Sequence, residues 1–211
     1  MYVPAHFKPD DAALHELLAR MGAADLITMT TRGLMATMLP LLYDERGPDG
    51  PARLLGHVAR NNDQWRERVH GEALVIVRGP DAYVSPTWYA TKREHGRVVP
   101  TWNYVTAHVY GGLVIHDDVG WVEALVRRLT ERHEGGRPEP WSVDDAPGQY
   151  IAGQLRAIVG VEVRISRIEG KFKLGQNRSE ADVDGVVAGL HASGEHELAD
   201  VMRREVRRSG D

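Results

Sequence analysis

The sequence predicts an α+β fold in which helices lie before, between and after the strands of a closed or half-closed antiparallel sheet. Several runs are rich in β-branched residues or alternate between apolar and polar positions, as strands do. Helical spacing of apolar residues occurs near the start of the chain, in its middle and at its end. The strands are joined by long connections.

The composition is that of a folded, soluble protein of 211 residues, with 42% hydrophobic and 27% charged residues. This length allows one domain of ordinary size and a smaller helical appendage. Cysteine is absent, which excludes disulfides and cysteine-ligated metal sites. No apolar run is long enough to span a membrane and the N-terminus lacks a signal-peptide pattern, so we expect a cytoplasmic protein.

The start of the chain predicts a helix followed by a β-hairpin. Asp10 is the candidate N-cap, apolar residues follow at helical spacing, and Gly22 provides the stop. Two β-rich runs between residues 26 and 44 meet at Arg32-Gly33, a short glycine-containing connection typical of a hairpin. Pro40 in the second run favours a strand edge or a bulge, because proline cannot donate to a sheet ladder.

The next part predicts a loop, short strands and an aromatic connection. Residues 44–51 are dense in turn formers and charges and predict an exposed loop. A short strand is expected to end near His57, and residues 60–67 to form a turn and a short helix. A strand over residues 72–80 is expected to stop at Gly79-Pro80, and a brief strand then leads into an aromatic, proline-containing loop.

One long strand, residues 98–112, has two different faces when it is read at a period of two. The aromatic and polar-tipped face carries Trp102, Tyr104, Thr106, His108 and Tyr110, and the small or β-branched face carries Thr101, Asn103, Val105, Ala107 and Val109. The small face suits a crowded interior such as a small barrel, whereas the aromatic face suits an interface or a flat ligand. Plain packing explains either face equally well. Gly111-Gly112 offers a bend at the end of the strand.

The remainder of the chain predicts helices around one further strand. Residues 119–134 have helical spacing, with Asp117 and Asp118 near the positive end of the helix dipole. Alternating valines and isoleucines predict a strand from Val159 to a turn at Gly170. The other expected elements are a loop before residue 149, a short helix at 149–157 and two terminal helices at 179–193 and 196–208.

Three polar clusters are candidates for ligand binding, and each has a structural alternative. In GHVARNN, the residues His57, Arg60, Asn61 and Asn62 stand at a strand-to-helix junction, where an arginine fork and free N–H groups can hold a phosphate. The alternative is a helix cap beside a solvated arginine. In KFKLGQNR, Lys173 and Gln176 can reach a phosphate or a flavin edge, or they belong to a solvated loop and cap.

The third cluster is the pair SPTWY and PTWNY, residues 85–89 and 100–104, which repeat proline, hydroxyl, tryptophan and tyrosine. Two such clusters can frame a flat heterocycle by stacking and edge hydrogen bonds. The alternative is a hydrophobic dimer contact, since Tyr and Trp concentrate at interfaces.

Other classes of site lack their marks in the sequence. The ten histidines show no HExxH or comparable spacing, so we expect no metal site. GxSxG, Walker and Rossmann motifs are absent, and no catalytic nucleophile can be named. A net charge of −4 offers no general attraction to DNA, and the only local basic patch is the arginine-rich C-terminal end.

Taken together, these stretches resemble the PaiB family of FMN-binding split-barrel proteins, which are known as negative transcriptional regulators. The matching pieces run from residue 1 to residue 178 in the order of the family, and they are MYVPAHF, ATMLPLL, LLGHVARNN, VRGPDAYVSPTWY, VVPTWNYVTAHVYG, LTERHE and AIVGVEVRISRIEGKFKLGQNR. The chain departs from the family pattern at Met38, Asp63 and Gly175, where His, Pro and Ser are expected. The departures at Met38 and Gly175 remove polar groups that could contact a cofactor.

The resemblance implies an antiparallel split β-barrel over residues 1–178 and a C-terminal helical extension over residues 179–211. It also implies a homodimer that binds FMN in a groove between subunits. The residues that it places at the cofactor are Thr37, His57, Arg60, Asn61, Trp88, Thr101, Trp102, Asn103, Lys173 and Gln176.

Three functions remain open on the sequence. The first is a dimeric FMN-binding regulator that acts on transcription directly or through a partner. The second is a flavin-dependent oxidoreductase for a small molecule, in which the flavin carries the redox chemistry. The third is a split barrel without cofactor that serves as a dimeric binding module.

Overall fold

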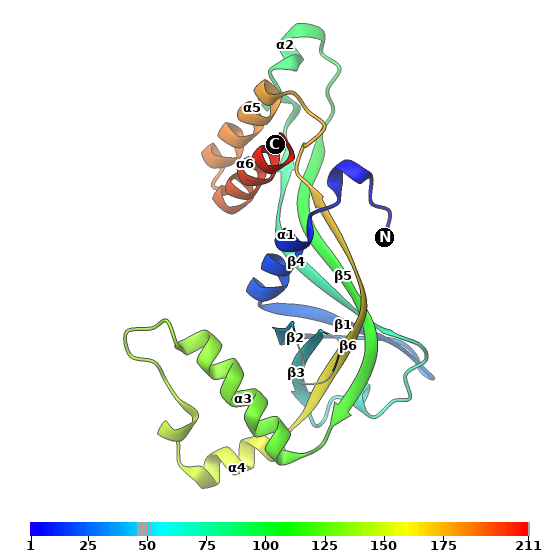
Figure 1. The fold of residues 1–211 in the computed structure, drawn as a ribbon, viewed down its shortest axis with the longest axis vertical. Helices are drawn as coiled ribbons and strands as arrows, with labels where there is room; N and C mark the ends of the chain where they lie inside the picture. Colours follow the sequence, from blue (N-terminus) through cyan, green and yellow to red (C-terminus); the bar gives the residue numbers. More distant parts are fainter. Residues whose placement is uncertain (46–49, 51, 211) are drawn as a thin grey trace. The chain divides into compact units, whose positions relative to one another are not determined.

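The computed structural model describes residues 1–45, 50 and 52–210 (Figure 1). Its sheet is a closed barrel with the strand order β1-β2-β3-β6-β5-β4, and neighbouring strands pair antiparallel in the registers determined for β1–β2, β1–β4, β2–β3 and β3–β6. The α+β split-barrel prediction is confirmed. The strands are β1 (Ala23–Thr30), β2 (Gly33–Asp44), β3 (Arg53–Ala59), β4 (Ala73–Val84), β5 (Thr101–His116) and β6 (Ile158–Lys173).

Helices fill the connections and both ends of the described chain. The α-helices are α1 (Asp11–Arg20), α2 (Thr91–His95), α3 (Val119–Glu134), α4 (Gly148–Arg156), α5 (Glu180–Ala192) and α6 (His196–Gly210). Short 3-10 turns are η1 (Ala5–Phe7), η2 (Asp63–Trp65), η3 (Pro86–Trp88) and η4 (Val143–Asp145). Among the described residues, no helix has the length and apolar character required to cross a bilayer.

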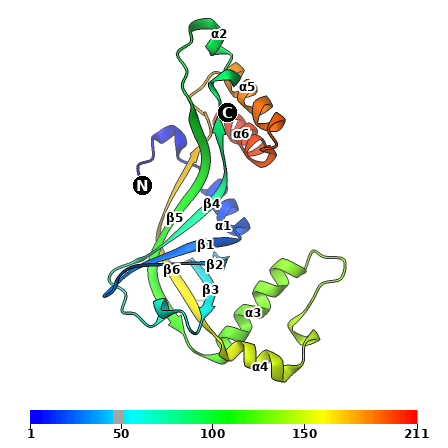
Figure 2. The same cartoon turned by 180° about the vertical axis from the view of Figure 1, so that it is seen from behind.

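The chain forms two compact units, which we call the barrel unit and the helical unit. The barrel unit contains residues 18–77 and 108–168, and the helical unit contains residues 1–17, 78–107 and 169–211. Figure 2 shows β1, β2 and β3 next to one another in the barrel unit. The predicted domain boundary after residue 178 remains a prediction.

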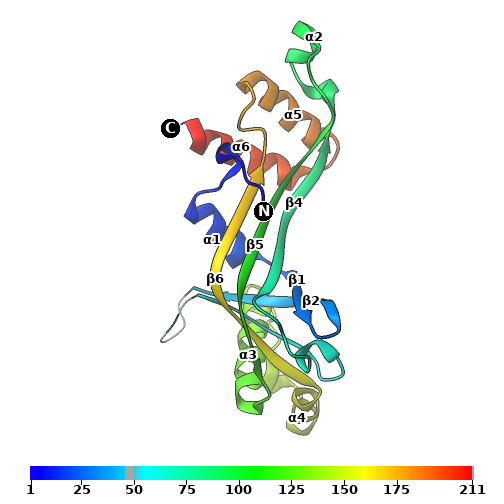
Figure 3. The same ribbon diagram turned by 90° about the vertical axis from the view of Figure 1, so that its right-hand side faces the viewer.

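The core of the helical unit forms where α5 and α6 pack on each other and on the strands. Figure 3 shows these two helices side by side. Val105 of β5, Leu174, Leu190 of α5 and Met202 of α6 are all buried in one apolar cluster. In the barrel unit, a second cluster joins Leu42 and Leu55 of the sheet to Leu125 and Leu129 of α3.

Several predicted elements are confirmed, with their end groups in place. The backbone N–H of Ala13 donates to Oδ1 of Asp10 at 2.6 Å at the start of α1, and Asp118 caps α3 through the N–H of Trp121 at 2.8 Å. The predicted hairpin is confirmed, with its turn at residues 31–32, one residue before the expected Arg32-Gly33 connection. The two faces of β5 are also confirmed, because Asn103, Val105, Ala107 and Val109 are buried whereas their neighbours along the strand are more exposed.

Two glycine positions were wrongly predicted to end strands. β4 continues through Gly79-Pro80, and a Cβ at Gly79 would lie 2.8 Å from Cγ1 of Val105, so this glycine permits close packing within a continuous strand. β6 continues through Gly170 to Lys173, and a Cβ at Gly170 would lie 2.7 Å from Cγ of Pro9. A glycine that makes room for a neighbour and a glycine that makes a turn look alike in sequence.

Pro40 stands where β2 changes its partner. Residues 33–40 pair with β1, and residues 41–44 pair with β3. A residue without an N–H group is tolerated at this point, which explains how proline fits inside a twelve-residue strand. The expected loop at residues 44–51 lies largely outside the described residues.

Candidate functional site

In the barrel unit, Thr37 of β2 belongs to a small polar network. Nδ2 of Asn62 donates to Oγ1 of Thr37 at 2.8 Å, while Oδ1 of Asn62 accepts from the N–H of Gln64 at 2.8 Å and caps η2. Nε2 of the buried Gln64 donates to Oγ1 of Thr28 at 3.0 Å and to the carbonyl of Leu26 at 3.2 Å. This network fixes the Thr37 hydroxyl against η2.

Asn62 belongs to the GHVARNN cluster, and the cap that was the alternative for this cluster is confirmed at Asn62, whereas Gln64 was not predicted as a site residue. An asparagine directly before a short helical turn is a capping signal in sequence. The partner of its amide, Thr37, is 25 residues away in the chain and is brought close only by the hairpin.

Arg60 is bound by protein acceptors. Its Nη1 and Nη2 donate to Asp117 at 3.1 and 2.5 Å, and its Nε donates to the carbonyl of Arg156 at 2.7 Å. The hydrogen bond to Asp117 raises the pKa of Arg60 above its usual value. Since these donors already have partners, a phosphate at Arg60 would have to displace Asp117. Asn61 lies exposed in the adjacent turn.

His57 is partly buried on β3. Burial lowers the pKa of His57 below the usual value of 6.5. Its Nδ1 is buried and has no hydrogen-bond partner among the described residues. Two residues earlier on the same side of β3, Leu55 packs in the cluster of α3, so His57 faces a largely apolar environment.

In the helical unit, Trp102 and Lys173 lie together. Nζ of Lys173 donates to Oγ1 of Thr101 at 2.6 Å and to the carbonyl of Trp102 at 2.5 Å. Burial, followed by the neighbouring charges of Lys171 and Arg178, lowers the pKa of Lys173. The Trp102 side chain is 55% exposed.

Further aromatic rings and a second lysine extend this surface. The rings of Tyr83 and Trp102 meet edge to face with centroids 6.3 Å apart, and Nζ of Lys171 lies 5.5 Å from the ring centroid of Tyr104. These side chains alternate with buried neighbours on β4, β5 and β6 and therefore share the outer face of the sheet. We call this set the aromatic–lysine face: Tyr83, Trp102, Tyr104, Lys171 and Lys173.

Three other predicted residues are engaged elsewhere in the helical unit. Asn103 is buried on the opposite side of β5 from Trp102, and its Nδ2 donates to Sδ of Met202 at 3.3 Å. The ring of Trp88 lies against α5, since a Cβ at Gly189 would lie 2.3 Å from Cδ2 of that ring. Gln176 bonds to the backbone of its own turn, with Nε2 donating to the carbonyl of Phe172 at 2.7 Å. Their cofactor contacts remain predictions.

The structure shows the surroundings of two residues, Gly175 and Met38, at which the chain departs from the expected family pattern. Gly175 has φ +82°, a left-handed conformation that favours glycine over serine. Met38 is 72% exposed on β2, where its thioether faces outward. Among the described residues, no group of three or more His, Asp or Glu side chains is arranged to hold a metal ion.

Comparisons with known proteins agree with this architecture. A family model described as "Putative FMN-binding domain" matches residues 1–167. The chain is 33% identical to "Protease synthase and sporulation protein PAI 2" of Bacillus subtilis over 192 residues, which cover 90% of this chain and 89% of that protein.

Solved structures share the fold at low identity. The FAD and heme binding protein from Mycobacterium smegmatis aligns with a TM-score of 0.55 and 16% identity, covering 85% of this chain and 78% of the other. A conserved hypothetical protein from Mycobacterium tuberculosis aligns with a TM-score of 0.57 and 12% identity, covering 82% and 91%. At such identities the similarity concerns the fold alone.

Proposed function

This chain belongs to the PaiB family of FMN-binding split-barrel proteins, and on that premise we propose that it is a flavin-binding regulator of transcription that acts as a dimer. The observation that carries the proposal is the aromatic–lysine face of a chain whose family binds FMN. A planar, anionic cofactor needs an apolar surface to stack on and cations for its phosphate.

The residues of this face fit both parts of FMN. The exposed ring of Trp102, braced edge to face by Tyr83, offers a stacking surface for the isoalloxazine. Lys171 and Lys173 offer ammonium groups for the phosphate. The cofactor contact of Thr37, whose hydroxyl is held by Asn62 in the barrel unit, remains a prediction, and Arg60 of the same unit is committed to Asp117.

Bound FMN supplies one- and two-electron redox chemistry, and the protein contributes binding, orientation and proton control. Lys173 holds Thr101 and the backbone of Trp102 in place, so its ammonium orients the stacking residue as well as carrying charge. Because the pKa of Lys173 is lowered, this ammonium gives up a proton more readily than an exposed lysine does.

Exposed apolar side chains on the barrel unit support a dimer. Met29, Leu34 and Met38 on β1 and β2 are 46%, 71% and 72% exposed, and Met29 is directly opposite Leu34 across the hairpin. Apolar residues gathered on one exposed sheet face are typical of a protein interface. Gel filtration with light scattering tests the dimer, and a monomer at micromolar concentration would refute it.

We propose that regulation works through a partner protein or the flavin state and does not use direct DNA contact by α6. Nη1 of Arg204 contacts Glu16 at 3.5 Å, and Nη1 of Arg208 contacts Glu205 at 3.0 Å, so these arginines are paired with carboxylates. The net charge of −4 points the same way. A low-salt gel shift with operon-proximal DNA should show no specific band, and specific binding would overturn this route.

A flavin-dependent oxidoreductase is the second candidate, and Lys173 is the observation that favours it. A half-buried lysine with a lowered pKa beside a stacking tryptophan is suited to donate a proton to a bound small molecule. Anaerobic mixing of the FMN-loaded protein with NADH or NADPH separates the functions. Bleaching of the flavin supports a reductase, and an unchanged spectrum removes that support.

The first experiment is a titration of the purified protein with FMN. Saturable changes in the visible flavin spectrum are expected, with weaker binding in Trp102→Ala and Lys173→Met. A protein that causes no spectral change would overturn flavin binding and favour a cofactor-free binding module.

A further inference from the structure

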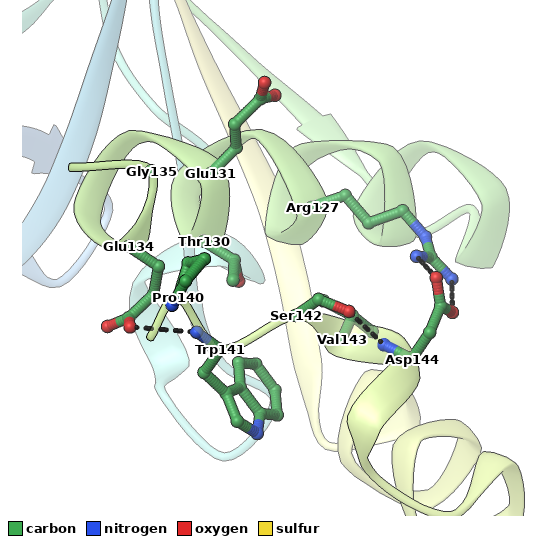
Figure 4. Close-up of a pocket in the computed structure, with 10 residues that line it drawn as sticks. All are labelled: Arg127, Thr130, Glu131, Glu134, Gly135, Pro140, Trp141, Ser142, Val143 and Asp144. Carbon is green, nitrogen blue, oxygen red and sulfur yellow. Dashed lines mark hydrogen bonds and ion pairs between the residues drawn. The ribbon is translucent and has the colours of Figure 1, made fainter. Parts of the chain in front are cut away.

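A hollow of about 310 Å³ lies within the barrel unit, beside α3 and the segment that leads from α3 to η4 (Figure 4). The second half of α3 forms one side, and residues 140–144 form the other. None of the residues assigned above to FMN lines it. Ligand binding in this hollow is therefore independent of the proposed flavin site.

The segment opposite α3 is tied down at several points. The N–H of Trp141 donates to Oε2 of Glu134 at 3.2 Å. Ser142 and Asp145 form a reciprocal capping box around η4, and the side chain of Val143 is buried. Figure 4 shows the Glu134 and Arg127 contacts at opposite ends of the hollow. The hollow is thus a built feature of the fold.

The charge that lines the hollow is negative. Arg127 is its only lining guanidinium among the described residues, and it is bound on two sides, to Asp144 at 2.9 Å and to Glu123 at 2.8 Å. These hydrogen bonds, with Asp144 first, raise the pKa of Arg127, so its charge is already matched. Glu131 and Glu134 also line the hollow, and only Glu134 has an arginine, Arg137, at 3.2 Å.

The wall of the hollow also contains an exposed aromatic ring. Trp141 is 46% exposed although it is large and apolar. An indole beside carboxylates is a favourable environment for an organic cation, because the negative face of the ring and the carboxylates attract the same charge. The volume is at the lower end of the range of small-ligand pockets.

Arg137 is 63% exposed, so its ion pair with Glu134 is weak and can be replaced. We propose that this hollow binds a small organic cation, whose primary ammonium group takes the place of Arg137 at Glu134 and whose short alkyl chain packs against Trp141. The Thr130 hydroxyl lines the same hollow and offers a neutral hydrogen-bond acceptor. Carboxylates outnumber unmatched cations here, so anions of the same size are excluded.

The test uses n-butylammonium as the probe and n-butanol as its uncharged match, with the full chain at low salt. The indole N–H signals of the five tryptophans report binding by NMR, and Trp141→Ala identifies the signal of Trp141 by its loss. Butylammonium should shift the Trp141 signal saturably, in both FMN-free and FMN-loaded protein. Butanol should bind at least about fivefold more weakly.

Two variants and a control decide the outcome. In Glu134→Gln, the amide oxygen can still accept the Trp141 N–H, so the segment is kept while the charge is lost, and affinity for butylammonium should fall about fivefold or more. Tyr150→Ala removes another exposed aromatic residue, outside the hollow, and should leave the affinity unchanged. Equal binding of both probes, no saturable shift, or an unchanged affinity in Glu134→Gln would overturn the proposal.

Discussion

Replacing Gly185 of α5 by alanine should destabilise the protein, although alanine is the better helix former. A Cβ at Gly185 would lie 2.1 Å from the carbonyl oxygen of Trp88, far inside van der Waals contact. Gly189, one turn later, faces the Trp88 ring in the same way. Trp88 therefore packs directly against α5 at these two positions, because glycine has no side chain there.

The magnitude follows from two opposing effects. Glycine to alanine in a helix interior gains roughly 1 kcal/mol from backbone propensity. Forcing an extra carbon into a packed contact costs about 1–3 kcal/mol, and here the carbon meets a backbone oxygen, which cannot rotate away. A contact of 2.1 Å with a backbone oxygen places the cost at the upper end of this range, at about 2–3 kcal/mol, so Gly185→Ala should lower the free energy of unfolding by about 1–2 kcal/mol.

Gly153→Ala is the matched control. Gly153 lies within α4, and a Cβ there would meet nothing within 4 Å. This variant should be stabilised by about 0.5–1 kcal/mol. Urea unfolding followed by circular dichroism measures both, and the two midpoints should move in opposite directions. If Gly185→Ala is as stable as Gly153→Ala, Trp88 does not pack on α5 as described.

Three further predictions concern the site and its supports. Lys173→Met should weaken FMN binding by about tenfold, the loss expected for a charge-assisted contact at a half-buried site, and equal affinity by titration would contradict its role. Asn62→Ala should cost about 1 kcal/mol of stability through the lost η2 cap and the lost Thr37 contact, with Asn61→Ala, an exposed neighbour, as the control that stays near wild type in the same urea assay. For His57, the folded-state pKa is lowered by burial, so the unfolded chain takes up a proton first as the pH falls; stability should decrease below about pH 6.5, and His57→Phe should show a smaller drop in melting temperature between pH 7.5 and 5.5.

A buried ionic cluster anchors the start of α3 in the barrel unit. The ring of His116 stacks on Trp121 with centroids 3.9 Å apart, and Nε2 of His116 lies 2.8 Å from Oε2 of the buried Glu162. Nε of Arg164 donates to the other oxygen of Glu162 at 2.9 Å. Burial opposes the ionised Glu162, but these hydrogen bonds win and lower its pKa. Through Trp121, this cluster attaches the start of α3 to β5 and β6.

Some residues of the proposed site lie in stretches that resemble the family, and others depart from the expected family pattern. Trp102, Thr101 and Lys173 lie in two of the stretches that carry the resemblance to the family, and Nζ of Lys173 joins these stretches by its contacts. At Gly175, where the resemblance led us to expect serine, the left-handed backbone conformation favours glycine. The flavin titration and the measurement of the oligomeric state test whether this chain binds FMN and forms a dimer, as the resemblance to the family implies.

Local signals were enough to predict most elements of the fold. Three features depend only on neighbouring residues in the chain: the cap at Asp10, the hairpin turn at residues 31–32 and the helical spacing of α3. The two faces of β5 also followed from sequence, because side chains of a strand alternate wherever the strand is placed.

Tertiary structure alone decided which polar groups are free to bind a ligand. Sequence placed Arg60 at a junction suited to phosphate, but Asp117 lies 57 residues away and takes its guanidinium. Trp88 and Trp102 belong to nearly identical motifs, yet the ring of Trp88 packs against Gly189 of α5 while the ring of Trp102 stays exposed. Partners that are distant in the chain leave no local signal in the sequence. The candidate residues were therefore predictable from the sequence, but whether each side chain is already bound by another part of the protein was not.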